Sequence, residues 1–479
     1  MTRRVLSVAS ECVPLLKTGG LADVVGALPK ALAEHGWHMR VLMPAYPGLA
    51  TRLGKRPKAL WQDADLFGGP AKVLGGRVEG LDMLLLDAPH LYDRPGGPYG
   101  GPGGDHADND LRFAALSWAA AEIARNGLAD GWTPDVLHAH DWQAGFAPAY
   151  LRYGPETAVK TVITVHNIAF QGNTGAERLE ALRLPRAQFT AKGLEYYGHL
   201  SSLKAALVTA DAITTVSPTY ARELMRPEFG MGLQGVIGQR ANDVSGILNG
   251  VDTEVWSPEA DPAIHAYSAK KLGAKKTNRA ALIDEFGLGY FEGPLAVLVS
   301  RLTTQKGIDL IPGALSEFTW RGGALIVLGS GDPVLEAAMR REAELNPTRI
   351  AVRIGYDEAL SHRMFAGGDA VLVPSRFEPC GLTQMYGLRY GTVPVVAATG
   401  GLNDTVIDAS PAALAAGVAT GIKFAPTDAL GLAQALRRLA DLYADKRTWA
   451  RIQRNGMKAP VDWAQSSGQY AALYASLAP

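Results

Sequence analysis

Short apolar runs recur along the chain and alternate with segments in which apolar residues return every three or four positions. In the first half these runs are VLSVAS, MRVLMP, DVLHAH, TVITVHN, AITTVS and GILNGV. They are rich in β-branched residues and apolar on both faces, which is typical of strands in a parallel sheet with helices on both sides. One of the helical patterns between them covers residues 21–32 and ends at Gly36. The first half is therefore predicted to consist of βαβ units.

The second half repeats this alternation after a polar interruption. A polar stretch follows residues 249–252, and then the runs LAVLVS, ALIVLG, AVRIGY, AVLVPS and VPVVAA resume the strand pattern. We therefore predict an α/β protein made of two Rossmann-like, doubly wound halves, with a hinge near residues 245–256. The apolar segment SGQYAALYASL predicts a final helix that packs on one of the two halves.

Two segments depart from this pattern. Residues 71–87, AKVLGGRVEGLDMLLLD, predict a hairpin or meander added to the first sheet. Residues 90–110 are so rich in glycine and proline that they predict a long surface loop without regular structure. Because long loops near a site are often lids, mobility of this loop is a hypothesis.

Composition and charge narrow the choice of partners and compartment. The 479 residues contain 47 Lys and Arg and 47 Asp and Glu, so the formal net charge of +0 argues against nucleic-acid binding. No apolar run reaches the roughly 20 residues that a membrane helix needs. Ser10, Glu11 and Pro14 interrupt the first apolar stretch, which argues against a signal peptide. Cys12 and Cys380 are too few for a disulfide framework. We expect a cytoplasmic protein with neither nucleic-acid nor membrane partners.

A Lys-Thr-Gly-Gly turn, residues 17–20, follows the first predicted strand and opens the helix over residues 21–32. Its backbone N–H groups and the helix N-terminus can face a phosphate or a carboxylate, and Lys17 adds positive charge. The turn has the complete spacing of neither a P-loop nor a dinucleotide fingerprint. A tight turn with a solvated lysine is the alternative interpretation.

Charged residues also follow two predicted strands of the second half. Arg301 and Lys306, in SRLTTQKG, can converge on a diphosphate and stabilise the negative charge of a leaving group. Glu378 stands beside Gly381–Thr383, whose backbone N–H groups can face an anion. The alternatives are two surface cations flanking a turn, and a solvated glutamate beside a structural turn.

Three other motifs give weaker signals. Gly329-Ser330-Gly331 follows a strand but lacks a third glycine, which argues against a nicotinamide cofactor. His138, His140 and Asp141 have the spacing of metal ligands, but no further cluster of donors accompanies them. Cys380 has no histidine nearby in sequence to activate it, so packing is a better interpretation than nucleophilic catalysis. We therefore expect neither a metal nor a cofactor.

Two polar residues end strands of the first half. His166, in TVITVHN, and Asn249, in GILNGV, would lie at the carboxyl edge of the first sheet. They are either functional groups or satisfied structural polar groups. Asp108-Asn109-Asp110 mimics the metal-binding pair of some sugar transferases, but no strand precedes it to aim it, and it is interpreted as loop.

Six motifs occur in a fixed order between Lys17 and Thr405: KTGGLADVVGALPKAL, HAHDWQAG, TVHNIAFQG, ILNGVD, SRLTTQKG and PSRFEPCGLTQMYGLRYGTVPVVAATGGLNDTV. This set resembles bacterial glycogen synthase and its plant relative, starch synthase. The resemblance implies a retaining glycosyltransferase with two Rossmann-like domains facing across a deep cleft, the GT-B arrangement. It implies ADP-glucose as donor, and as acceptor the non-reducing end of an α-1,4-glucan such as glycogen or a maltooligosaccharide. It also implies that no metal is needed.

The resemblance also implies domain boundaries and site residues. The implied domains are 1–248 on the acceptor side, 249–457 on the nucleotide-sugar side, and 458–479 as a helix crossing back to the first domain. The implied catalytic residues are His166, Glu378, Arg301, Lys306 and Asp141. The implied donor-binding residues are Lys17, Gly19, Gly20, Asp23, Asn249, Tyr356, Cys380, Gly381, Leu382 and Thr383.

Several of these residues have implied roles. The two cations of SRLTTQKG would hold the donor's diphosphate, and Gly381–Thr383 would add amides and a hydroxyl to its distal phosphate. Tyr356 matches the position that packs against adenine. Glu378 would bind hydroxyls of the transferred glucose, and His166 would lie near the reacting face of that sugar.

One position departs from the broader superfamily, whose motif has two glutamates separated by seven residues. The second position is Tyr386 here, a change that glycogen synthases of the bacterial type commonly share. No carboxylate is obviously placed as a nucleophile, so we favour attack from the side of the leaving group as the retaining mechanism.

Two alternative functions remain open from the sequence. A related transferase with UDP-glucose or another acceptor would be distinguished by donor competition. A glucan-binding scaffold without activity would bind glycogen and release no ADP from ADP-glucose.

Overall fold

The computed structural model describes residues 3–54 and 57–478, and the chain divides into two compact units. Unit 1 comprises Met1–Asn249 and Trp463–Pro479, and unit 2 comprises Gly250–Asp462. Residues 1, 2, 55, 56 and 479 lie outside the described residues. The assignment of an acceptor side and a nucleotide-sugar side to the two domains stays a prediction.

The described residues of unit 1 form a nine-stranded sheet in the order β14-β13-β9-β8-β1-β2-β5-β4-β3. Neighbours from β14 to β5 are parallel, whereas β4 is antiparallel to both β5 and β3. The chain begins at β1, adds β2 and β5 on one side, and returns to place β8 on the other side of β1. Such a switch point is where α/β sheets bind ligands. The strands are β1 (Arg3–Val8), β2 (Trp37–Pro44), β3 (Lys58–Asp63), β4 (Ala71–Val78), β5 (Leu81–Asp87), β8 (Val136–His140), β9 (Lys160–Val165), β13 (Ala212–Thr215) and β14 (Val244–Gly246).

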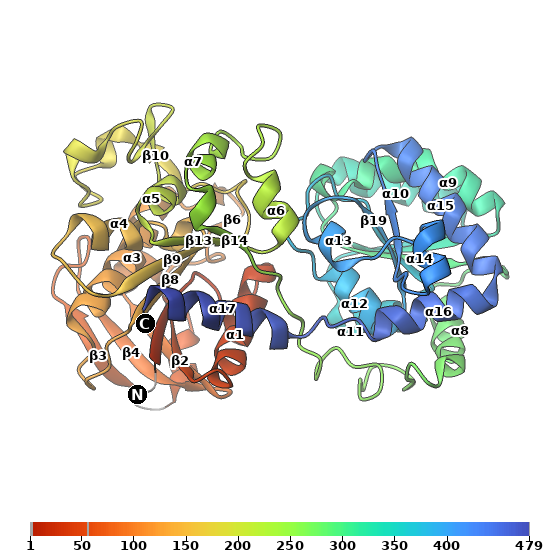
Figure 1. Ribbon diagram of the computed structural model, residues 1–479, viewed down its shortest axis with the longest axis horizontal. Coiled ribbons are helices and arrows are strands. Elements are labelled where there is room, and N and C mark those ends of the chain that lie inside the picture. Colours follow the sequence, from red (N-terminus) through yellow and green to blue (C-terminus); the bar gives the residue numbers. More distant parts are fainter. Residues whose placement is uncertain (1–2, 55–56, 479) are drawn as a thin grey trace. The chain divides into compact units, whose positions relative to one another are not determined.

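Helices cover this sheet (Figure 1), and the small strands form a separate three-stranded sheet, β10-β12-β11, and a β6-β7 pair. The helices are α1 (Gly20–Ala33), α2 (Pro89–Tyr92), α3 (Asn109–Asn126), α4 (Phe146–Tyr153), α5 (Ser202–Thr209), α6 (Pro218–Glu223), α7 (Gln234–Gln239) and α17 (Trp463–Leu477). The small strands are β6 (Gly100–Gly101), β7 (Gly104–Asp105), β10 (Asn173–Gly175), β11 (Glu195–Tyr196) and β12 (His199–Ser201). The predicted hairpin over residues 71–87 is confirmed, because β4 and β5 pair antiparallel around a turn between Val78 and Leu81.

The prediction for residues 90–110 is wrong in part, because this segment contains the β6-β7 hairpin and the start of α3. A buried arginine, Arg112, explains why this segment has a defined conformation. The Arg112 guanidinium donates to the backbone oxygens of Leu91 and Pro98, both at 2.9 Å, and to Asn109 Oδ1 at 2.6 Å. Asn109 Nδ2 in turn donates to the Tyr99 carbonyl at 2.8 Å. The loop is thus fixed by Arg112 and Asn109, which donate to its backbone carbonyls.

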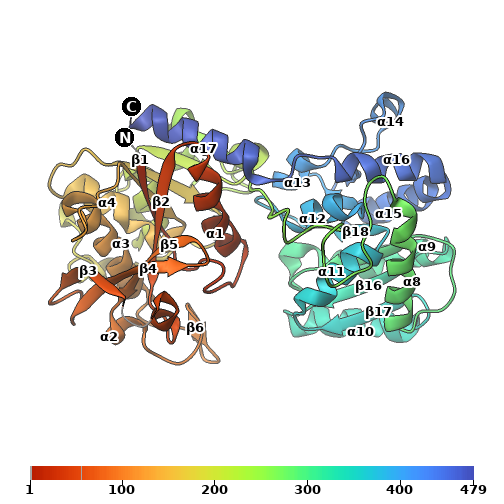
Figure 2. The same cartoon turned by 90° about the horizontal axis from the view of Figure 1, so that it is seen from below.

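Helix α17 packs against α1 in unit 1, as Figures 1 and 2 both show. The Tyr474 ring meets the Trp37 ring edge to face, with centroids 5.3 Å apart. Its hydroxyl lies 2.7 Å from His138 Nδ1, so the helix is joined to strand β8 by a buried hydrogen bond. Tyr470 and Trp463 belong to the same apolar cluster as β1 and α1.

Unit 2 contains a parallel sheet in which the described strands run in the order β17-β16-β15-β18-β19-β20. This is the Rossmann order 3-2-1-4-5-6, with the switch point between β15 and β18. The strands are β15 (Leu295–Val299), β16 (Ala324–Gly329), β17 (Ile350–Ile354), β18 (Ala370–Val373), β19 (Val393–Ala397) and β20 (Ile422–Phe424). The helices are α8 (Lys275–Glu285), α9 (Ile311–Trp320), α10 (Pro333–Leu345), α11 (Glu358–Gly367), α12 (Thr383–Tyr390), α13 (Gly400–Thr405), α14 (Pro411–Ala416), α15 (Ala429–Ala444) and α16 (Lys446–Met457).

Alternate residues of the unit 2 strands enter two different cores. Leu298 of β15 belongs to the core that includes α9 and α15, whereas Val297 belongs to the core that includes α8 and α11. Both faces of the sheet are therefore buried, which is why the strand sequences are apolar throughout. The prediction of an α/β protein with doubly wound halves is confirmed for both units.

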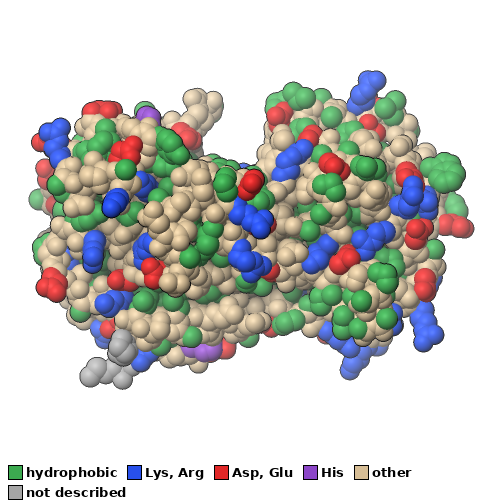
Figure 3. Space-filling view, turned by 45° about the horizontal axis from the view of Figure 1, so that its top comes forward, with side chains coloured by type: hydrophobic (Ala, Val, Ile, Leu, Met, Phe, Trp, Pro, Cys, Tyr) green, Lys and Arg blue, Asp and Glu red, His purple; other side chains and the backbone are tan. Residues whose placement is uncertain are grey.

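Acidic and basic side chains lie among one another on the face shown in Figure 3. This mixture agrees with the formal net charge of +0. Any anion that binds must therefore be met by charges and dipoles at a local site.

We expect Tyr474→Ala to destabilise unit 1 by about 3 kcal/mol or more, because it leaves a cavity under α17 and removes the partner of His138. Urea unfolding followed by circular dichroism measures the change. Tyr290→Ala, at a tyrosine that is 84% exposed, is the control and should change stability little. Equal effects of the two substitutions would contradict the structural role of the carboxyl-terminal helix.

Candidate active site

Two loops meet at the switch point of unit 2, one after β15 and one after β18. The Arg376 amide donates to the Gln305 carbonyl at 2.9 Å, and Gln305 Nε2 donates to the Phe377 carbonyl at 3.3 Å. Gly307 has a left-handed φ of 69°, and a Cβ atom there would lie 2.0 Å from the Pro374 oxygen. Only glycine fits this close approach, so the two loops are held together by their backbones.

This contact brings together Lys306 and Glu378, two of the residues expected to be catalytic. Lys306 Nζ lies 2.6 Å from Glu378 Oε2, and the Ser375 hydroxyl donates to the same oxygen at 2.8 Å. Glu378 is only 6% exposed, so little water surrounds it. The Lys306 ammonium therefore compensates the charge of the Glu378 carboxylate in a largely dry environment. Arg301 lies on the same loop as Lys306, is exposed, and makes no ion pair with any residue that the structure describes.

The Gly381–Thr383 step leads directly into helix α12. Gly381 adopts a left-handed φ of 74°, and Leu382 precedes the helix without a side-chain cap. The first N–H groups of a helix lack intrahelical acceptors and carry its positive dipole end, so they can bind an anion. Gln384 fixes the turn from inside, because its Nε2 donates to the carbonyls of Cys380 and Gly381 at 3.0 and 2.8 Å. Cys380 is buried and forms no disulfide, in line with packing.

Two tyrosines of unit 2 have different environments. Tyr356 follows β17 and is 75% exposed, so its ring is accessible to a planar ligand. Tyr386 instead stacks on Trp256, with centroids 3.7 Å apart, and the other face of Trp256 stacks on His362 at 4.0 Å. The ring of Tyr386 is therefore part of an aromatic stack within unit 2.

A carboxylate that the sequence did not single out fixes the Lys-Thr-Gly-Gly turn of unit 1. Glu11 follows β1, is 3% exposed, and accepts hydrogen bonds from the amides of Thr18 and Gly19 at 2.5 and 3.3 Å. The hydroxyls of Thr18 and Tyr99 also donate to it, at 2.8 and 2.9 Å. The signal that could have revealed Glu11 is its position just after the strand at the switch point.

These bonds change the interpretation of the turn. Two amides expected to face a ligand, those of Thr18 and Gly19, donate to the protein's own carboxylate. Helix α1 begins at Gly20, and Lys17 Nζ pairs with Asp23 Oδ1 at 2.8 Å. The groups of the turn that remain suited to an outside anion are the exposed Lys17 ammonium and the amide at the start of α1.

The parallel register of β8 and β9 brings Asp141 and His166 together, because His140 lies opposite Thr164. Asp141 Oδ1 accepts from the backbone amides of His166 and Asn167 at 2.6 and 3.3 Å. Asp141 has a positive φ of 53°, a strained conformation for a non-glycine residue. Burial raises the pKa of Asp141 to about 7, against the opposing effect of these two hydrogen bonds.

Three histidines line this part of the sheet. His166 Nε2 lies 3.0 Å from His140 Nδ1, and His140 Nε2 lies 3.1 Å from the Ser7 hydroxyl. His138 bonds instead to Thr164 Oγ1 at 2.6 Å. Burial lowers the pKa of His166 to about 3, so its imidazole is neutral near pH 7. Within residues 3–54 and 57–478, no three or more His, Cys, Asp or Glu side chains form a group that could hold a metal ion.

Asn249 ends the first of the two chain segments that form unit 1 and is buried, with an exposed fraction of 7%. Its side-chain oxygen has no hydrogen-bond partner among the residues that the structure describes. A buried polar atom of this kind is normally satisfied by a water molecule or a ligand.

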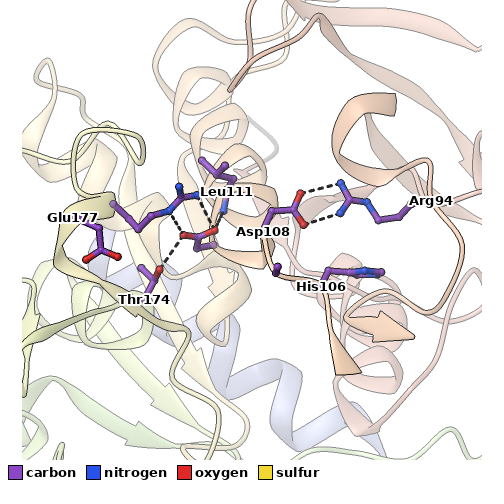
Figure 4. Close-up of a pocket in the computed structure, with 9 residues that line it drawn as sticks. Arg94, His106, Asp108, Leu111, Thr174 and Glu177 are labelled. Carbon is purple, nitrogen blue, oxygen red and sulfur yellow. Dashed lines mark hydrogen bonds and ion pairs between the residues drawn. The ribbon is translucent and has the colours of Figure 1, made fainter. Parts of the chain in front are cut away.

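A polar pocket of about 630 Å³ lies elsewhere in unit 1 (Figure 4). Arg94 binds Asp108 through two hydrogen bonds of 2.7 and 2.9 Å, and Arg178 binds Asp110 at 2.7 Å. Thr174 also donates to Asp110 at 2.9 Å. The two aspartates that mimic a metal-binding pair thus pair with arginines, and they lie at the start of α3 rather than within a free loop.

Two Rossmann-like units, each with charged groups at its switch point, define a glycosyltransferase of the GT-B class. Residues 4–239 match the family described as starch synthase catalytic domain, and residues 293–441 match glycosyl transferases group 1. Glycogen synthases of Cereibacter sphaeroides and Jannaschia sp. are 66% and 57% identical to this chain. These alignments cover 99% of this chain and 98% and 99% of the two relatives. The chain belongs to the glycogen synthase family, a family of hexosyltransferases.

Solved structures agree with this assignment. The catalytic domain of starch synthase IV from Arabidopsis thaliana, bound to ADP and acarbose, is 32% identical with a TM-score of 0.88 and full coverage of both chains. Sucrose-phosphate synthase from Thermosynechococcus elongatus, at 20% identity and a TM-score of 0.61 over 99% of both chains, shows the fold alone. The family, fold class and transferase activity that the six motifs implied are confirmed. None of the helices in the described part of the chain has the length and apolarity to cross a membrane.

We expect the stability of Asp141→Asn relative to the wild type to rise with pH. An unfolded aspartate ionises near its ordinary pKa of 3.8, whereas folded Asp141 keeps its proton up to about pH 7. The stability that depends on this proton is fully present below the unfolded pKa and is lost as pH rises through the folded pKa. The variant has no charge to bury, so it should gain about 2.5 kcal/mol relative to the wild type between about pH 5 and pH 8.

Urea unfolding of both proteins across this pH range measures the difference. A difference that stays constant with pH would show that Asp141 ionises normally in the folded protein.

We expect Glu11→Gln to loosen the Lys-Thr-Gly-Gly turn, because a neutral amide with one oxygen cannot accept the four hydrogen bonds that the carboxylate accepts. Hydrogen bonds to charged groups contribute about 1.5–3 kcal/mol, so exchange of the Thr18 amide hydrogen should accelerate roughly tenfold to a hundredfold. Hydrogen exchange followed by mass spectrometry measures this. The exposed Glu34→Gln is the control, and equal exchange in both variants would contradict the role of Glu11.

Proposed function

We propose that this chain transfers glucose from ADP-glucose to the non-reducing end of an α-1,4-glucan, with retention of anomeric configuration and release of ADP. The observation that carries the proposal is the Lys306–Glu378 pair at the switch point of unit 2, beside the uncapped start of α12. The starch synthase IV domain described above, whose structure contains ADP and acarbose, supports the nucleotide and the glucan-like acceptor. Glycogen or a maltooligosaccharide is the proposed acceptor.

In this proposal, different residues of unit 2 bind different parts of the donor. Arg301 and Lys306 bind the diphosphate, and the amides of Leu382 and Thr383 add to the distal phosphate. The exposed ring of Tyr356 packs against adenine. Glu378 accepts hydrogen bonds from hydroxyls of the glucose once a phosphate engages its lysine partner.

The unit 1 residues act on the sugar and the donor in the same proposal. His166 lies near the reacting face of the glucose. Asp141 holds the backbone of His166 in place, because its Oδ1 accepts a 2.6 Å hydrogen bond from the His166 amide. Lys17, Asp23 and Asn249 contact the donor, with Gly19 and Gly20 allowing a close approach. The buried, unsatisfied oxygen of Asn249 supports its role, because it has acceptor capacity left for a donor hydroxyl.

The reaction breaks the bond between glucose C1 and the distal phosphate oxygen of ADP. The 4-hydroxyl of the acceptor attacks C1 from the side of the leaving group, and its proton passes to the departing phosphate. Cationic groups stabilise the charge that develops on that phosphate, so no metal ion is required. Cytoplasmic localisation is part of the proposal, and two cysteines that form no disulfide suit a reducing compartment.

We expect Arg301→Ala and Lys306→Ala each to lower kcat for ADP release by about a hundredfold or more, because each removes charge stabilisation from the leaving group. Arg301 is exposed, so its loss leaves the fold intact. The exposed Lys270→Ala is the control and should retain activity. Release of ADP and extension of a short maltooligosaccharide measure the rates.

The same assay tests the donor and the mechanism. Preference for UDP-glucose in competition would contradict ADP-glucose as the donor, and loss of extension on addition of a chelator would contradict the metal-free mechanism. Isolation of a glucosyl ester on Asp141 or Glu378 would contradict same-side attack. Binding of glycogen without release of ADP would favour the scaffold without activity.

A further inference from the structure

Three apolar side chains of unit 1 stand out because they face solvent. Phe170 is 56% exposed, Tyr197 is 74% exposed and Met231 is 39% exposed, and we call these three residues the aromatic patch. Hydrogen bonds connect the segments that carry them. Gln171 Nε2 and the Tyr196 hydroxyl both donate to the Met231 carbonyl, at 2.9 and 2.6 Å.

The backbone holds the patch in its exposed position. Tyr197 and Met231 have left-handed φ values of 48° and 45°, which cost roughly 1–3 kcal/mol each for residues other than glycine. A Cβ atom added at Gly232 would lie 3.1 Å from Cε2 of the Tyr197 ring, and the rings of Tyr196 and Tyr197 pack edge to face with centroids 4.8 Å apart. Strain of this kind clusters at ligand-binding sites, so the exposure of these side chains calls for a function.

A short turn joins the patch to the candidate catalytic residues of the same unit. Asn167 accepts from the amides of Ala169 and Phe170 at 3.0 and 3.3 Å, and its own amide donates to Asp141 Oδ1 at 3.3 Å. The carboxylate that holds the backbone of His166 therefore also fixes the turn that presents Phe170. The Asn167 turn therefore links the patch to Asp141 and His166 through hydrogen bonds.

The chemistry of the patch matches a sugar chain. Two largely exposed aromatic rings and one phenol hydroxyl suit a pyranose, which has apolar C–H faces and a rim of hydroxyls. A second copy of the chain fits less well. Three partly exposed side chains, each burying at most roughly 250 Å², fall short of the roughly 800 Å² per partner of a stable interface.

We propose that the aromatic patch binds the glucan chain of the acceptor by stacking Phe170 and Tyr197 on its sugar rings. This proposal rests on the proposed function, because it identifies where unit 1 holds the α-1,4-glucan. It assigns to these residues binding of the chain and no part in the chemical step. Loss of the patch should therefore weaken acceptor binding and leave donor binding unchanged.

Calorimetric titration with maltoheptaose, without donor, tests the proposal. Phe170→Ala and Tyr197→Asn should each raise the dissociation constant about fivefold to tenfold, the loss expected for one aromatic contact. Asparagine tolerates the left-handed backbone at position 197, so this variant removes the ring without adding strain. Tyr197→Phe keeps the ring and should bind nearly as the wild type does. Tyr290→Ala, an exposed tyrosine of unit 2, is the matched control.

Three results would overturn the proposal. The first is unchanged maltoheptaose affinity in both ring-deletion variants. The second is an equal loss of affinity for ADP, which would mean that the segment has lost its structure. The third is a fall in molar mass by light scattering in the variants alone, which would assign the patch to a second copy of the chain.

Failure of the proposed function gives a different result. Wild-type protein that binds maltoheptaose through the patch but releases no ADP from ADP-glucose would leave this inference standing and refute the transfer. Active enzyme whose maltoheptaose affinity ignores the patch would refute this inference alone.

Discussion

The ion pair between Lys306 and Glu378 is the interaction on which the unit 2 site depends. Removing two charges from water costs several kcal/mol per ion, and only good geometry with further hydrogen bonds offsets that cost. The pair has both, with a 2.6 Å separation and a hydroxyl from Ser375. That geometry requires the loops after β15 and β18 to touch, which in turn requires glycine at position 307. Neither charge can therefore move far without disturbing the loop that carries the other.

If the site binds the donor as proposed, such a pair would couple the two parts of the donor molecule. A phosphate that engages Lys306 takes away the cation that compensates Glu378, and sugar hydroxyls are donors that can replace it. Binding is then an exchange of partners rather than the filling of an unsatisfied site. Unit 1 also has a buried carboxylate whose hydrogen bonds are made within the protein. Glu11 accepts hydrogen bonds from the backbone amides of Thr18 and Gly19, which are uncharged donors. The turn is held in shape before any ligand arrives, which lowers the conformational entropy lost on binding.

The sequence predicted the sheets well because strands buried on both faces must be apolar throughout. It also placed Arg301, His166 and Glu378 after strands, because these polar residues follow apolar runs in the sequence. It could not predict the pairing of Lys306 with Glu378, which lie 72 residues apart and meet only because β15 and β18 are neighbours. Glu11 was missed for a similar reason. Its four donors come from two different loops, and local sequence gives no sign of that convergence.

Tyr386 shows how a departure from a motif can be structural. The broader superfamily has a glutamate at this position, but here the side chain lies against the indole of Trp256, which also stacks on His362. A glutamate would place a carboxylate on the electron-rich face of that indole and would give up a stacked pair worth about 1 kcal/mol. The tyrosine at 386 is therefore part of the packing around Trp256, and a glutamate at this position would lose that contact.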